Sequence, residues 1–331
     1  MSARRSRTAI AGALLAVALG AGACAPAAGG EKVVFTFDQR ITSVDLLLGI
    51  ERGYFARQGL EVELATFNGT TETLPSLAQG RIDVAPTGVF GAAYLNVIGR
   101  GARVRLVAAR AVHRADKCGY ASFVARSALL DSGRLSDFAS LRGLRIDADP
   151  TSSQYFHWSR LFGLGGLRPD EVLAIRLPTH LKLEALRSGQ IDVTITTEPS
   201  VHEIVSRGVG KVWMPVGDVS PDHQNSFLLF GPRLLDERRD LGRRVMAGYL
   251  DAVRDYLREG RSERIVETVA RLTRMPPEDV RQLCWPDWST DGRIDATQLL
   301  ALQEWALGLG LIDAVVPIPE LVDESFLDDA R

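Results

Sequence analysis

The sequence predicts an α/β protein of two lobes joined by a hinge of two strands, with further helices after the second lobe. Two observations support this fold class: strand-like and helix-like stretches alternate along the chain, and one helix, glycine and strand unit occurs twice. Such alternation is typical of a mostly parallel sheet covered by helices. A mature chain of about 300 residues exceeds what one hydrophobic core usually serves, which favours two lobes.

Residues 1–23 have the pattern of an export signal. Arginines precede an uncharged apolar run that is too short to cross a bilayer and that ends in small residues before Cys24. These residues resemble the acylation site of exported bacterial lipoproteins, so we expect a lipid on Cys24 and a linker over residues 25–32. A plain cleavage site beside an incidental cysteine is the alternative. The Arg4-Arg5 pair leaves the general secretory and twin-arginine export routes both open.

Composition excludes several classes of partner and site. The formal net charge is −2, with no basic stripe, which argues against nucleic acid as a partner. Apart from Cys24 the chain has only Cys118 and Cys284, too few for a structural zinc site. In an oxidising compartment these two cysteines can form a disulfide, and two separate buried thiols are the alternative. No two histidines have a metal-ligand spacing; we expect His113, His157 and His202 on the surface, and no metal or cofactor.

Four strands and a helix are expected in the first part of the mature chain. The strands are expected at residues 33–37, 62–67, 82–86 and 104–109. The helix is expected over residues 43–58, because apolar residues recur on one face at the helical period. Ser43 stands where it can cap the start of this helix, and Gly59 ends it.

A repeat divides the chain into two similar halves. Six residues recur at identical spacing, first as Leu74, Leu77, Gly80, Ile82, Asp83 and Val84 and then as Leu183, Leu186, Gly189, Ile191, Asp192 and Val193. Each copy predicts a helix, a glycine in the left-handed conformation and a buried strand that is entered through an aspartate. Two lobes built to one plan are therefore expected.

The chain is expected to change lobes twice. A strand over residues 121–126 leaves the first lobe, and a strand over 225–231 returns to it. The first lobe then comprises residues 33–124 and 225–331, and the second lobe residues 125–224. Helices are expected at 234–258, 264–273, 276–284 and 296–309, packed on the first lobe. Two connections between lobes make a hinge that closes over a ligand.

A ligand site is expected beyond the carboxyl ends of the strands, where helix N-termini offer free N–H groups. The candidate residues in the first lobe are Gln39, Arg40, Thr42, Asn68, Gly69, Thr87 and Gly88. Those in the second lobe are Thr151, Ser152, Ser153, Tyr155, Thr197 and Glu198. The hydroxyls of residues 151–153 precede a helix and favour a strongly accepting or anionic group, although ordinary helix capping explains one of them equally well.

Several motifs resemble one family of binding proteins. They are Gly53-Tyr54-Phe55, Gly59-Leu60 with Val62, the two Gly-x-Ile-Asp units, Thr87-Gly88 and Glu198-Pro199. The chain resembles the substrate-binding proteins of ABC importers for nitrate, sulfonates, taurine and thiamine-precursor pyrimidines. This resemblance implies the type II periplasmic-binding-protein fold, with two Rossmann-like lobes, and partners in a membrane permease and an ATPase. The implied protein is a monomer without a cofactor, held by its lipid at the outer face of the cell membrane.

The resemblance leaves the ligand and two other functions open. Relatives that bind sulfonates carry Gly-Ser and a histidine where this chain has Pro150-Thr151 and Gln154, which argues against a sulfonate. Glu198 would suit an amine or an aminopyrimidine. An enzyme on the same fold, such as a pyrimidine-precursor synthase or a desulfinase, is the main alternative, and a solute sensor is another. Because Cys118 has no recognisable catalytic partner, we expect binding without catalysis.

Overall fold

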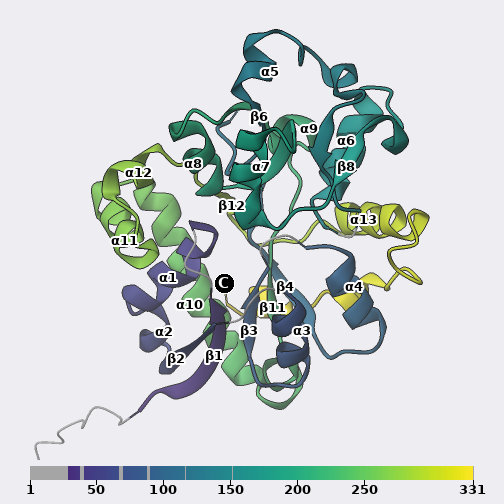
Figure 1. Ribbon diagram of the computed structural model, residues 1–331. Coiled ribbons are helices and arrows are strands. Elements are labelled where there is room, and N and C mark those ends of the chain that lie inside the picture. The colour runs from purple at the N-terminus through teal and green to yellow at the C-terminus, as the bar shows by residue number, and fades with distance from the viewer. Residues whose placement is uncertain are drawn as a thin grey trace, which may run out of the picture.

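The computed structural model describes residues 29–37, 41–66, 70–87, 90–115, 117–150 and 152–330. The predicted export signal, Cys24 and residues 25–28 of the predicted linker lie outside these residues. The described chain forms two five-stranded sheets and one two-stranded sheet. Figure 1 shows the two large sheets in separate lobes, with β1 to β4 in the lower lobe and β6 to β9 in the upper one. We call these the first and the second lobe.

The first sheet has the strand order β2-β1-β3-β11-β4. Its strands are β1 (Glu31–Phe37), β2 (Leu60–Thr66), β3 (Val84–Pro86), β4 (Arg105–Ala109) and β11 (Phe227–Phe230). β1 runs parallel to β2 and β3, whereas β11 is antiparallel to β3 and β4. The sheet is therefore mixed: β11, which returns from the second lobe, runs opposite to the other four strands.

The second sheet has the strand order β10-β6-β9-β7-β8. Its strands are β6 (Ala121–Arg126), β7 (Arg145–Asp147), β8 (Leu173–Ile175), β9 (Val193–Thr197) and β10 (Gly210–Pro215). β7 is parallel to β8 and β9, and β6 is antiparallel to β9 and β10. Read from β8, this sheet repeats the plan of the first, with β6 in the place of β11. Since β6 lies wholly in the second sheet, the chain changes sheets before Ala121 rather than at residue 125.

The sequence repeat corresponds to equivalent structure in both lobes. α3 (Thr70–Ala78) and α7 (Lys182–Ser188) each precede a glycine in the left-handed conformation, with φ of 70° at Gly80 and 74° at Gly189. Asp83 then accepts a hydrogen bond from the backbone N–H of Val34 on β1, at 2.8 Å. Asp192 accepts one from the backbone N–H of Arg145 on β7, at 3.0 Å.

The helix predicted over residues 43–58 is broken in two. A short 3₁₀ turn (Ile41–Ser43) leads into α1 (Val44–Glu51), and α2 (Tyr54–Arg57) follows. Gly53 separates the helices with φ of 70°, a conformation that glycine adopts without strain. The break turns Phe55 into the core, where its ring meets Phe35 edge-on at 5.1 Å. Ser43 makes no side-chain capping bond to α1.

The C-terminal region is largely helical, as predicted. Its longer helices are α10 (Arg239–Glu259), α11 (Glu263–Thr273), α12 (Pro277–Gln282) and α13 (Ala296–Gly308). α10 packs on α1 and α2 of the first lobe. The sequence missed β12 (Asp287–Trp288), which pairs with β5 (Ala111–Val112). α13 also reaches the second lobe, where Trp305 meets Phe156 of α6 (Tyr155–Leu164) edge-on at 5.3 Å.

Two crossing segments connect the lobes. The first runs from β5 to β6, and the second from α9 (Val216–Val219) to β11. A disulfide joins Cys118, in the first crossing segment, to Cys284, which follows α12, with the two Cα atoms 5.4 Å apart. This bond fastens the first crossing segment to the C-terminal region. No helix among the described residues is both long and apolar enough to cross a membrane.

Candidate functional site

The carboxyl ends of the two sheets face each other. Gly91 follows β3 and precedes α4 (Ala92–Gly99), and Ser153 follows β7 and precedes α6. A Cβ atom placed on Gly91 would lie 2.5 Å from Oγ of Ser153. Only a residue without a side chain therefore permits this approach between the lobes.

A cavity of about 120 Å³ opens at the carboxyl edge of the second sheet. Among the residues that the structure describes, ten line this cavity, and all ten belong to the second lobe. They are Asp147, Asp149, Ser152, Gln154, Tyr155, Trp158, Leu177, Thr179, Lys182 and Ile195. The cavity thus contains two of the predicted ligand residues, Ser152 and Tyr155. We call it the carboxyl-edge cavity.

A buried ion pair forms part of the wall of this cavity. Nζ of Lys182 lies 2.7 Å from Oδ2 of Asp147 and donates to the carbonyl oxygen of Ile195 at 2.8 Å. Thr194 donates its hydroxyl to the same carboxylate at 2.8 Å, and the indole N–H of Trp158 donates to the Asp147 carbonyl. Each buried charge therefore has both a counter-charge and hydrogen bonds, which buried ions require. Neither Lys182 nor Asp147 was among the predicted site residues.

Arg110 connects the segments at the carboxyl ends of the strands in the first sheet. Its side chain is 1% exposed and makes a bidentate ion pair with Asp45 of α1, at 2.9 and 2.7 Å. The same guanidinium donates to the carbonyl oxygens of Thr42 and Thr87, at 2.8 and 3.1 Å, and to the hydroxyl of Ser226. One side chain thus holds segments that follow β1, β3 and β4 and the one that precedes β11. The sequence analysis missed this role.

The predicted residues Thr42 and Thr87 contribute mainly to this arrangement. The hydroxyl of Thr87 is buried and accepts a hydrogen bond from the backbone N–H of Phe227 at 2.8 Å, which fastens β3 to β11. Thr42 contributes its carbonyl to Arg110 and keeps a partly exposed side chain. The other candidates in the first lobe all lie outside the described residues: Gln39, Arg40, Asn68, Gly69 and Gly88.

The predicted residues of the second lobe have different structural roles. Thr151 lies outside the described residues, and Ser153 makes the close approach to Gly91. Thr197 ends β9 and is partly buried. The hydroxyl of its neighbour Thr196 is buried without a hydrogen-bond partner, which leaves a polar group unsatisfied near this edge.

Glu198 does not line the carboxyl-edge cavity. Its side chain is buried, and its two oxygens accept hydrogen bonds from the backbone N–H groups of His202, at 2.9 Å, and Cys284, at 3.0 Å. Burial raises the pKa of this carboxyl group above its ordinary value, although both hydrogen bonds oppose the change. Glu198 therefore connects the end of β9 to the C-terminal region beside the disulfide, a long-range contact that its helix-start position in the sequence did not indicate.

Three histidines meet where the lobes join. His113 lies in the first crossing segment, His157 on α6 and His223 in the second crossing segment. The ring of His157 lies 5.2 Å from each of the other two rings, centroid to centroid. The predicted surface placement is wrong for His113 and His157, which are buried because both crossing segments pack against α6. No group of His, Cys, Asp and Glu side chains in the described part of the chain is arranged to hold a metal ion.

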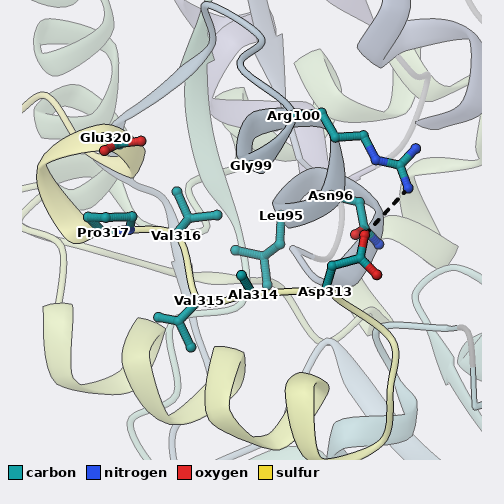
Figure 2. A pocket seen from close by; sticks show the side chains of 10 residues that line it. All are labelled: Leu95, Asn96, Gly99, Arg100, Asp313, Ala314, Val315, Val316, Pro317 and Glu320. Carbon is teal, nitrogen blue, oxygen red and sulfur yellow. Dashed lines mark ion pairs between the residues drawn. The ribbon is translucent and has the colours of Figure 1, made fainter.

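A further cavity, of about 130 Å³, lies between the end of α4 and the C-terminal residues Asp313 to Glu320 (Figure 2). Leu95 and Asn96 of α4 and Arg100, which follows this helix, face a C-terminal segment there, and Arg100 pairs with the exposed Asp313 at 3.8 Å. None of its lining residues follows a strand of either sheet. We therefore place the candidate ligand site at the carboxyl edges and not in this cavity.

Comparison with known proteins identifies the family of this chain. A model of the NMT1-like family matches residues 27–270. The chain belongs to the NMT1-like family. No curated protein sequence is similar enough to this chain to count as a match.

Solved structures confirm the predicted type II periplasmic-binding-protein fold. The ligand-binding component of an ABC-type import system from Staphylococcus aureus, solved with zinc bound, is 15% identical, with a TM-score of 0.74 over 91% of this chain and 99% of that one. The periplasmic aliphatic sulphonate-binding protein SsuA from Escherichia coli is also 15% identical, with a TM-score of 0.73 over 90% and 99% of the two chains. At such low identity these neighbours show the fold of this family member and not its ligand.

An enzyme shares the fold as well. The desulfurization enzyme DSZB is 16% identical, with a TM-score of 0.63 over 91% of this chain and 98% of that one. The fold therefore accommodates both binding and catalysis, and function has to be argued from the site. In this chain the two cysteines within the described residues are joined in a disulfide, so neither offers a thiolate.

Proposed function

We propose that this chain is the solute-binding component of an ABC importer, which binds a small polar organic solute or anion between its lobes and delivers it to a permease. The observation that carries the proposal is the approach of the two carboxyl edges at Gly91 and Ser153, next to the polar carboxyl-edge cavity. Ligands of open α/β sheets bind at this edge. A hinge of two crossing segments lets such lobes close around a solute.

The lining of the carboxyl-edge cavity suggests the chemistry of the solute. Asp147 and Lys182 neutralise each other, and Asp149 pairs with Arg176 at 3.0 Å. Formal charge is therefore nearly balanced, and the groups offered to a ligand are mainly hydrogen-bonding ones such as Ser152 and Gln154. This balance favours a polar solute with several donors and acceptors over a multiply charged one.

Export and membrane anchoring complete the proposal. We propose that residues 1–23 are removed and that Cys24 carries a lipid that holds a monomeric protein at the outer face of the cell membrane. The disulfide between Cys118 and Cys284 supports an oxidising compartment. Labelling of the expressed protein with radioactive palmitate tests the anchor: Cys24→Ser should lose the label and appear in the soluble fraction. A labelled Cys24→Ser protein would contradict it.

A ligand screen by thermal shift tests the binding function. The mature protein is heated with nitrate, bicarbonate, alkanesulfonates, taurine, aminopyrimidines and small aromatic acids in turn. A solute at 100 times its dissociation constant adds about 2.7 kcal/mol to the free energy of unfolding, which raises the melting temperature by a few degrees. Mass spectrometry of the bound compound then separates binding from catalysis, because an importer component returns its solute unchanged.

Two matched variants locate the site. Ser152→Ala removes a hydroxyl that lines the carboxyl-edge cavity, and we expect about tenfold weaker binding of the solute found in the screen. Ser188→Ala removes an exposed hydroxyl at the end of α7 and should leave affinity unchanged. Equal affinities of the two variants would place the solute elsewhere, and a chemically altered compound would favour an enzyme of the desulfurization type.

A further inference from the structure

A second recess lies beside the first crossing segment. It has a volume of about 300 Å³, and none of its lining residues borders the carboxyl-edge cavity. The recess lies between the end of α10, the segment around β12 and the first crossing segment. We call it the hinge recess. Its size falls at the lower end of the range for small-molecule sites.

Aromatic rings form one wall of the hinge recess. Tyr256 stacks on Trp285 with ring centroids 6.1 Å apart and meets Trp288 edge-on at 6.3 Å. Both tryptophans are 3% exposed, so packing holds their rings in place. A planar ring that enters the recess would meet this wall at a small cost in side-chain entropy.

One polar group of this wall makes no hydrogen bond of normal geometry within the described part of the chain. The indole N–H of Trp288 is buried and has no hydrogen bond of normal geometry, although the Tyr256 hydroxyl lies near it. The indole N–H of Trp285, by contrast, donates to the carbonyl oxygen of Val280 at 3.0 Å. Buried donors are almost always satisfied in folded proteins, so an unpaired one in the wall of a recess indicates a place for an acceptor.

The rim of the hinge recess is positively charged. Of the described residues, Arg114, Lys117 and Arg261 line it together with one carboxylate, that of Asp287, which pairs with Lys117 at 3.1 Å. Arg114 has its own partner in Asp222. Among the described residues no carboxylate pairs with Arg261, whose guanidinium lies over the Trp285 ring, 5.8 Å from its centroid. An anion at this rim would therefore find a guanidinium that is not already neutralised.

The disulfide fixes the recess in this shape. Lys117 on the rim precedes Cys118, and Trp285 in the aromatic wall follows Cys284. The bond between these cysteines therefore ties the rim to the wall. A site that is already formed loses less entropy on binding than one that must be assembled.

We propose that the hinge recess is a second binding site, which takes a small planar aromatic anion such as an aromatic carboxylate. The ring packs on the wall of Tyr256 and the two tryptophans, an oxygen of the anion accepts from the Trp288 indole N–H, and Arg261 pairs with its charge. The ligand would contact both the first crossing segment and the C-terminal region. This site is independent of the solute that the carboxyl-edge cavity binds.

Fluorine NMR of protein labelled with 5-fluorotryptophan tests the proposal, because the five tryptophans report on different places. With 2-naphthoate as the probe, we expect saturable shifts of the Trp285 and Trp288 resonances, and no shift at Trp213 on β10. Trp158 lines the carboxyl-edge cavity and serves as an internal reporter of binding there. A shift at Trp158 alone, or at no tryptophan, would overturn the proposal while leaving the solute-binding function untouched.

Variants and probe analogues separate specific recognition from general attraction. Arg261→Gln should weaken 2-naphthoate binding about fivefold. Arg81→Gln makes the same change of charge at an exposed arginine remote from the recess and should have no effect. Neither 2-naphthalenemethanol, which lacks the charge, nor cyclohexanecarboxylate, which lacks the aromatic ring, should shift Trp285. Equal weakening by both variants would show non-specific attraction and overturn the proposal.

Discussion

At the scale of single residues, buried ions hold the candidate site together. Arg110 uses its whole guanidinium to connect Asp45, Thr42, Thr87 and Ser226 at the carboxyl edge of the first sheet. A buried ion pair of this kind adds little net stability compared with apolar residues of the same shape. Loss of one partner is costly, however, because the other charge then stays buried without compensation.

We therefore expect Arg110→Met to lower the free energy of unfolding by about 3–5 kcal/mol, since Asp45 would remain buried and unpaired. Urea denaturation followed by circular dichroism measures this loss. Arg187→Met removes an arginine from an exposed pair with Glu184 and should cost less than about 0.5 kcal/mol. A similar loss in both variants would mean that burial of the Arg110 pair is unimportant.

Sequence patterns indicated those residues of the candidate site whose signal is local. Ser152 and Tyr155 were predicted because they stand between a strand and a helix, and both line the carboxyl-edge cavity. Arg110 gave no such signal, since its partner Asp45 is 65 positions away and lies in a mostly apolar helix. Lys182 of α7 was missed for the same reason, because its counter-ion Asp147 lies on β7, which is distant in the sequence. Glu198 was predicted as a ligand residue from its place at the end of a strand, and in the structure both of its oxygens accept hydrogen bonds from backbone N–H groups.

At the scale of elements, the repeat was the part of the fold that sequence predicted best. A helix, a left-handed glycine and a buried strand depend on neighbouring residues, so spacing alone indicates them. The break at Gly53 and the antiparallel entry of β11 depend on distant packing and were not predicted.

The two repeat aspartates show that equivalent positions can have different surroundings. Asp192 pairs with Arg145 and Arg126, whereas among the described residues Asp83 pairs only with Arg233 and has one buried oxygen without a partner.

The two aspartates should respond differently to the same substitution. Burial opposes ionisation of Asp192, but the hydrogen bonds from Arg145 outweigh it and hold its pKa below the ordinary value. At Asp83 the effect of burial exceeds that of the hydrogen bonds and of Arg233, so the pKa of the carboxyl group is raised. We expect Asp192→Asn to lower the free energy of unfolding at pH 7 by about 1–3 kcal/mol and Asp83→Asn to cost less. Urea denaturation of both variants decides this, and a larger loss for Asp83→Asn would contradict the argument.

At the scale of the whole molecule, the junction of the lobes should make stability depend on pH. Burial lowers the pKa of His113 to about 3 and that of His223 to about 4, and it also lowers the pKa of His157. Arg160 reinforces the shift at His157 and His223, and Asp295 opposes it at His223. In the unfolded chain these groups titrate near 6.5. Below that pH the unfolded state binds more protons, so stability is complete above pH 6.5 and is lost as the pH falls towards 4.

Each fully buried histidine should therefore cost about 2 kcal/mol of stability at pH 5. We expect His113→Asn to reduce the difference in unfolding free energy between pH 7.5 and pH 5 by about this amount, because the variant has one fewer group to protonate. His180→Asn, at an exposed position, should leave the difference unchanged. Urea denaturation at the two pH values measures both. An unchanged difference in His113→Asn would show that this ring does not resist protonation in the folded protein.

The approach of Gly91 to Ser153 makes closure of the two lobes testable in one substitution. A methyl group on Gly91 would overlap Ser153, so Gly91→Ala must hold the carboxyl edges apart. If solute binds between the lobes, as proposed, we expect its affinity to fall about tenfold. Gly163→Ala, on α6 with open space around the new methyl group, should bind the solute normally. Adding Ser153→Gly to Gly91→Ala removes the side chain that the new methyl group would overlap, and we expect this double variant to bind the solute again when affinity is measured by calorimetry. Full affinity of Gly91→Ala alone would mean that the solute does not need this closed arrangement.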